Sequence, residues 1–117
     1  MQREELAALV CRKAFLELEA FRKRMLKKPG EIIYAKAYQI DIMVSIYEIL
    51  LEISRQVPLA VLKLLLTIPD LLAFFYSRWL RYGDSYEQEL EKNLQESIQF
   101  LGDTYERIAE EEGRKSA

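Results

Sequence analysis

A chain of 117 residues is long enough to bury one hydrophobic core and too short for two, so residues 1–117 are predicted to form a single domain. Half of the residues are apolar and 31% are charged, with only four Gly and three Pro, a composition that excludes disordered and fibrous proteins and is typical of helical ones. The net charge of -2 argues against a dedicated nucleic-acid coat.

The chain has one cysteine, Cys11, and no histidine. A single thiol excludes an intramolecular disulfide and a multi-cysteine metal site, and it fits a reducing cytoplasm. The lack of histidine removes the commonest metal ligand and the commonest general base. We interpret Cys11 as a small buried hydrophobe beside Val10 and Ala14. The sequence therefore predicts a cytoplasmic protein that is not an enzyme, with no catalytic, cofactor-binding or metal-binding residues.

Two long helices are predicted in the first half of the chain. Residues 2–28 place apolar side chains at three- and four-residue spacing, and Pro29-Gly30 ends this helix. Acidic residues near the start, Glu4 and Glu5, stand where an export signal needs basic ones, so no export signal is expected. Residues 31–56 carry two adjoining apolar stripes, which predicts a central helix with several neighbours.

The middle of the chain is apolar and interrupted by proline. Pro58 begins a short helix over 58–66, and Pro69 is predicted at the first position of another over 69–82, with Asp70 in its first turn. Val57 to Tyr76 is apolar enough to suggest a membrane segment, but Lys63, Asp70 and the central proline argue against a transmembrane span.

The last predicted helix covers 85–109, after a capping box that starts at Asp84 or Ser85. Its apolar residues recur about every 3.5 residues, as in a coiled-coil seam, and Gly102 inside it predicts a kink or a break. Residues 110–117 are expected to fray. The fold class is therefore all-α, a single-domain bundle of about five helices.

Several residues of the chain resemble a known family. They are Pro29-Gly30-Glu31-Ile32-Ile33, Lys36-Ala37-Tyr38, Asp70, Leu72-Ala73, Phe75-Tyr76, Trp79-Leu80 and Ser85. Over residues 29–95 the chain is similar to a family of small uncharacterised all-helical domains from gut Firmicutes, although that family is acidic and proline-bearing where this chain has Ser45-Ile46 and Leu71. The resemblance implies a cytoplasmic bacterial helical domain carried on mobile elements. The family has no assigned function, so the resemblance implies no site.

Charge is distributed unevenly along the chain. Residues 1–40 hold nine Lys or Arg against five Asp or Glu, whereas residues 83–117 hold four against ten. The candidate basic patch consists of Arg22, Lys23, Arg24, Lys27 and Lys28. Such a cluster is usually a solvated face, here one that balances the acidic last helix, and it is alternatively the phosphate-contacting surface of a nucleic-acid accessory protein.

The apolar residues outnumber those that one small core needs. We therefore predict a non-enzymatic protein-protein interaction module that self-associates, as a homodimer, or binds another protein through an apolar helix face. The candidate residues of this face are Leu62, Leu65, Leu66, Phe74, Leu90, Leu94 and Leu101. Phe75, Trp79 and Tyr82 share a helix face and are predicted to be core, while Phe74 belongs to the interface if it is exposed. A second alternative is that residues 57–76 lie on a membrane surface.

Overall fold

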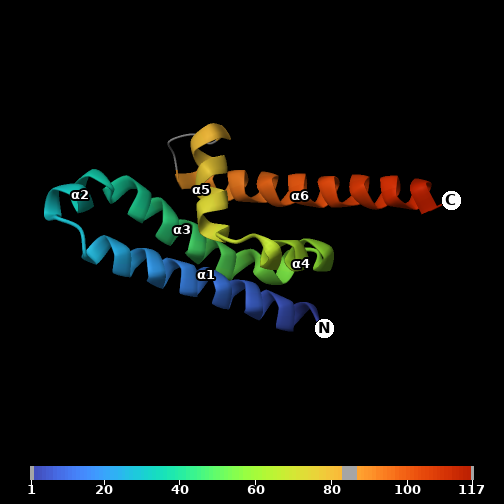
Figure 1. Cartoon of the computed structure of the whole chain (residues 1–117), viewed down its shortest axis with the longest axis horizontal. Helices are drawn as coiled ribbons and strands as arrows, with labels where there is room; N and C mark the ends of the chain where they lie inside the picture. Colours follow the sequence, from blue (N-terminus) through green and yellow to red (C-terminus); the bar gives the residue numbers. More distant parts are fainter. Residues whose placement is uncertain (1, 83–86, 117) are drawn as a thin grey trace.

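The computed structural model describes residues 2–82 and 87–116, and within these residues every regular element is helical (Figure 1). This confirms the all-α prediction. The elements are α1 (Arg3–Leu26), α2 (Gly30–Ala35), α3 (Ala37–Ile53), the 3-10 turn η1 (Ser54–Gln56), α4 (Leu59–Thr67), α5 (Leu71–Tyr82) and α6 (Glu87–Ser116).

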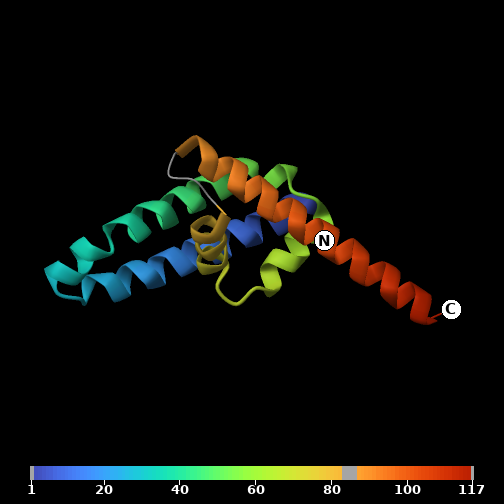
Figure 2. The same ribbon diagram turned by 90° about the horizontal axis from the view of Figure 1, so that it is seen from above.

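The molecule is elongated, with extents of 59 × 29 × 25 Å. Helices α1 and α3 form an antiparallel hairpin, and the much shorter α5 stands across its middle (Figure 1). Helix α4 packs on α1, while α6 packs on α5 and α4 and then projects beyond the bundle (Figures 1 and 2). The helices of the middle therefore cover only part of the hairpin.

Helix α5 supplies the centre of the core. Leu71, Leu72 and Phe75 are fully buried and Trp79 is nearly so, which confirms the core prediction for Phe75 and Trp79. The side chain of Tyr82 lies outside the described ones. Phe74 is half-buried and packs edge-on against the ring of Phe75. The amphipathic spacing of this helix thus fixes which of its faces meets the hairpin.

The N-terminus of α5 is held by side chains from two elements. Asp70 Oδ1 accepts a hydrogen bond from the Ala73 N–H at 3.2 Å, so Asp70 is the N-cap and the helix begins at Leu71 rather than at the predicted Pro69. From α1, Glu17 Oε1 accepts the Leu72 N–H at 2.9 Å. Lys13 Nζ contacts the same carboxylate at 2.7 Å and donates to the Pro69 carbonyl at 3.3 Å. A carboxylate at this helix end also complements the helix dipole.

A second polar link joins α5 to α6. Arg78 Nε donates to Ser97 Oγ at 2.8 Å, and the Ser97 hydroxyl donates to the Asn93 carbonyl at 2.9 Å. The Arg78 guanidinium also lies 4.6 Å from the centre of the Phe100 ring. Since Ser97 is fully buried, this contact sets the register of α6 on α5.

The predicted helix over 31–56 is divided in the structure. Lys36 has φ -98° and ψ 8°, outside helical values, and separates the six-residue α2 from α3. Neither Pro nor Gly marks this position, so the sequence pattern gives no signal for it. At the other end, Ser54–Gln56 tighten into a 3-10 turn because Pro58 disfavours helical backbone in the residue before it.

Helix α6 begins within the predicted region and ends later than predicted. It runs from Glu87 to Ser116 without a break at Gly102, so the predicted end at 109 is wrong and the helix is not broken there. The predicted capping box at Asp84 and Ser85 lies outside the described residues. The expected fraying of 110–117 concerns motion and stays a prediction.

We predict that Glu17→Ala lowers the free energy of unfolding by about 2 kcal/mol, because it removes a charged acceptor from the α5 N-terminus and the partner of Lys13. Urea denaturation measures this loss. Glu19→Ala is the control, since Glu19 makes only a 3.9 Å surface contact with Arg22 and should change stability little. Equal effects of the two substitutions would contradict the tethering role of Glu17.

Gly102→Ala should raise stability by about 0.5–1 kcal/mol, because alanine restricts the unfolded chain and favours helix. A Cβ at position 102 would lie 3.5 Å from Val61 Cγ2, an ordinary van der Waals contact. Thermal unfolding followed by circular dichroism tests this. A fall in the melting temperature would mean that α4 and α6 need the closer approach that glycine allows.

Candidate interaction surface

The leucines predicted to form an association face lie in the core of the chain itself. Leu62 and Leu65 of α4 are fully buried, as are Leu90 and Leu94 of α6, and Leu101 is 8% exposed. Leu66 and Phe74 are partly buried and pack against the same core. The prediction is therefore corrected for five of the seven residues: α4 and α6 bury these leucines within the bundle.

Another region with uncovered apolar side chains lies at the turn of the α1–α3 hairpin. None of the twenty residues 22–41, which we call the hairpin tip, is buried. Tyr34 is 84% exposed and Leu26 is 69% exposed, and α2 has no buried residue at all. In Figure 1 the tip, with α2 at its end, extends away from α4, α5 and α6.

A groove opens between α1 and the α2–α3 segment at this end. Its volume is about 370 Å³, and its lining is almost entirely apolar. We call it the tip groove; its apolar residues are Leu18, Phe21, Met25, Leu26, Ile33, Ile40 and Val44. Two charged side chains, Glu19 and Arg22, complete the lining. An apolar groove between two helices is a form of site that accepts an amphipathic helix.

The five residues of the predicted basic patch gather at the hairpin tip, and all are exposed. Arg22 lines the tip groove, and the Arg24 guanidinium lies 5.9 Å from the centre of the Phe21 ring. On a helical wheel Lys23 and Lys27 fall on the side of α1 away from the groove-lining Leu18 and Met25. Arg22 of this patch therefore lies at the groove, whereas Lys23 and Lys27 lie outside it.

The acidic end of α6 does not face the basic end of α1, contrary to the expectation that the two balance each other. The two regions lie at opposite ends of the long axis (Figure 1). Residues 103–112, which we call the α6 overhang, contain no buried residue and project past α4 (Figures 1 and 2). Tyr105 and Ile108 are about half exposed there.

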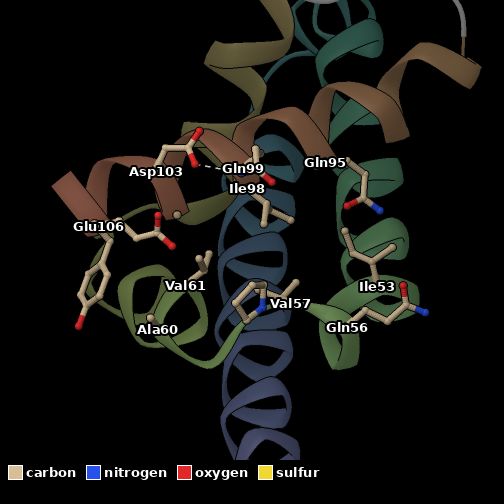
Figure 3. A pocket seen from close by; sticks show the side chains of 13 residues that line it. Ile53, Gln56, Val57, Ala60, Val61, Gln95, Ile98, Gln99, Asp103 and Glu106 are labelled. Atoms are coloured by element: carbon tan, nitrogen blue, oxygen red, sulfur yellow. Dashed lines mark hydrogen bonds between the residues drawn. The ribbon is translucent and has the colours of Figure 1, made fainter. Parts of the chain in front are cut away.

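A second hollow of about 390 Å³ lies between α6 and the segment that joins α3 to α4 (Figure 3). Its floor includes Ile53, Val57 and Val61, which are buried. Its edge is polar, and there the Gln99 amide donates to Asp103 Oδ1 at 3.0 Å. This hollow presents amide and carboxylate groups, whereas the tip groove presents hydrocarbon.

The surroundings of Cys11 are more polar than predicted. Cys11 is half-buried rather than fully buried, and its Sγ lies 3.4 Å from Ser54 Oγ and 4.0 Å from the Leu50 carbonyl oxygen. A hydroxyl and a carbonyl do not act as a base that makes thiolate. Within residues 2–82 and 87–116 no group of three or more Cys, Asp or Glu side chains could hold a metal ion.

The hairpin is fastened to α5 through two aromatic side chains. The buried Trp79 indole N–H donates to Tyr38 Oη at 2.7 Å. Burial raises the pKa of the nearby Tyr76 phenol, and Tyr38 adds to the rise. Because Tyr38 belongs to the hairpin tip, this contact joins the base of the tip to the core at the start of α3.

The predicted membrane-facing segment is folded into the bundle. In the part of the chain that is described, no single helix is long and apolar enough to cross a membrane; Leu59–Thr67 and Leu71–Arg81 meet that test only as a pair, which is bent by 102°. Leu62, Leu65 and Phe75 of these helices are fully buried, and Leu64, Leu66 and Ile68 are partly buried against the same core.

Comparison of the chain with protein-family models, with curated proteins and with solved structures finds no match. The resemblance noted over residues 29–95, and the bacterial origin that it implies, stay predictions.

The sequence reasoning missed the tip groove, although helix lengths contain a signal for it. A helix of 24 residues such as α1 is about 36 Å long, whereas the twelve-residue α5 is about 18 Å long. The Pro29-Gly30 turn makes α1 and α3 neighbours. Because α5 is only about half as long as α1, the end of the hairpin at this turn has no third helix to cover it.

Tyr38→Phe should cost about 1–2 kcal/mol, because it leaves the buried Trp79 N–H without its acceptor. Trp79 is the only tryptophan, so its fluorescence follows the unfolding transition directly. The matched control is Tyr34→Phe, which changes a strongly exposed side chain and should be neutral. A neutral Tyr38→Phe would show that the Trp79 N–H finds another acceptor.

Proposed function

We propose that this chain is a non-enzymatic helical interaction module that self-associates through the tip groove. The observation that carries the proposal is the run of twenty residues, 22–41, with apolar side chains and no buried residue. Exposed apolar surface of this kind marks protein-protein contacts in other proteins. The groove between α1 and the α2–α3 segment gives that surface a concave shape suited to one helix.

The chemistry of the groove supports a protein occupant. Its lining is hydrocarbon with one Glu and one Arg, so it lacks the several convergent polar groups that orient a small substrate. The single half-buried thiol fits a reducing compartment, and we therefore propose the cytoplasm as the site of action.

We predict that the protein has a solution mass of twice its 13.8 kDa chain mass at micromolar concentration. The double substitution Leu26→Gln/Ile33→Gln should weaken association by about 2 kcal/mol, about thirtyfold in Kd, because it makes two groove residues polar. Sedimentation velocity over a concentration series measures both values.

Leu16→Gln is the control for this substitution. Leu16 is an exposed leucine of the same helix that does not line the groove, so its replacement should leave the mass unchanged. A wild-type chain that sediments as a monomer at every concentration would overturn the proposal.

A further inference from the structure

The α6 overhang is a second apolar surface that the chain itself leaves uncovered. Tyr105 and Ile108 follow Leu101 at four and seven residues, so they continue the stripe that Leu94 and Leu101 bury against the bundle. Tyr105 borders the hollow that α6 forms with Pro58 and Ala60, whereas Ile108 does not line that hollow, and the helix projects past α4 (Figures 1 and 2). Tyr105 is 47% exposed and Ile108 is 48% exposed.

A helix in this position gains little from its own fold. Residues 103–112 span about 15 Å at the end of α6, and none of their side chains is buried, so they add little of the tertiary packing from which most helical stability in proteins comes. Packing of the exposed stripe against a groove would supply the missing stabilisation. The overhang therefore has the properties of a helical ligand, and the tip groove has those of its receptor.

The charges of the two surfaces are complementary. Residues 22–41 contain six Lys or Arg and two Asp or Glu, whereas residues 103–112 contain five Asp or Glu and one Arg. Within one chain the two regions lie at opposite ends of the 59 Å long axis, so an overhang cannot reach its own groove (Figure 1). A second copy of the chain can bring them together.

Resting on the function proposed above, we propose that the α6 overhang of one copy lies in the tip groove of a second copy. Tyr105 and Ile108 enter the apolar lining, and acidic residues such as Glu106 and Glu111 lie near Arg22, Arg24 and Lys28. In an antiparallel pair related by a two-fold axis, the same contact forms twice, once at each end.

Charge reversal tests this pairing with two variants of the full chain. The tip variant carries Arg22→Glu, Arg24→Glu and Lys28→Glu, so both of its ends are acidic. The overhang variant carries Asp103→Lys, Glu106→Lys and Glu111→Lys, so both of its ends are basic. Each variant alone should have a dimer Kd at least tenfold higher than wild type, because like charges then meet at both contacts.

An equimolar mixture of the two variants should restore the dimer, because each end of one variant is then complementary to an end of the other. Native mass spectrometry distinguishes this mixed pair from either homodimer by mass. High salt should weaken the wild-type dimer, since exposed charges are screened over about 3 Å at 1 M. Glu48→Lys/Glu52→Lys is the control: both residues are exposed on α3, lie outside both surfaces and should leave the dimer intact.

The outcomes separate this inference from the function on which it rests. If the Leu26→Gln/Ile33→Gln chain dissociates while both charge variants remain dimeric, the groove mediates self-association but does not hold the overhang. If the charge variants dissociate and their mixture stays monomeric, the pairing is wrong as well. A wild-type monomer that floats with phosphatidylserine vesicles or is retained on DNA would assign the basic tip to lipid or nucleic acid and overturn both proposals.

Discussion

The position of α5 across the hairpin is the constraint on which the other elements depend. Its buried face packs against α1 and α3, and Arg78 beside that face contacts α6, whereas Ser77 and Leu80 on the other side are exposed. Hydrophobic interactions are non-directional, so apolar burial keeps α5 against the hairpin without fixing its position along α1. The hydrogen bond from the Leu72 N–H to Glu17 fixes where the N-terminus of α5 lies along α1. Because α6 takes its register from Arg78 and Ser97, the direction of the overhang follows from the same placement.

The other helices cover only the middle of the α1–α3 hairpin, which explains why this small chain has both a buried core and exposed apolar side chains. The middle of α1 and α3 is closed by α4, α5 and α6, so the leucines of α4 and α6 are used within the chain. The ends are different, since α1 extends past α5 on one side and α6 extends past α4 on the other (Figures 1 and 2). Exposed apolar side chains therefore lie at both ends of the molecule, in addition to those along the outer faces of the helices, such as Leu16 and Leu80.

The periodicity of apolar residues in the sequence was sufficient to predict the helices and most of the buried core residues. The stripe of Leu90, Leu94 and Leu101 indicates burial correctly, but a stripe does not say whether the covering partner belongs to the same chain. The break at Lys36 could not be predicted, because no proline or glycine marks it. The contact between Glu17 and α5 could not be predicted either, because it joins residues 55 positions apart and depends on how α5 crosses α1. The basic patch was identified by composition, while the groove beside it depends on tertiary arrangement.

The unbroken course of α6 through Gly102 has a geometric consequence for assembly. Two different surfaces on one chain generate a closed ring or pair when the rotation from copy to copy returns to its start, and an open filament when it does not. That rotation is set by the angle between the axis of α6 and the axis of the hairpin. In the pairing proposed above, the continuous α6 sets the direction of the overhang that begins at the next residue, so a bend at Gly102 would select between a closed pair and an open fibre.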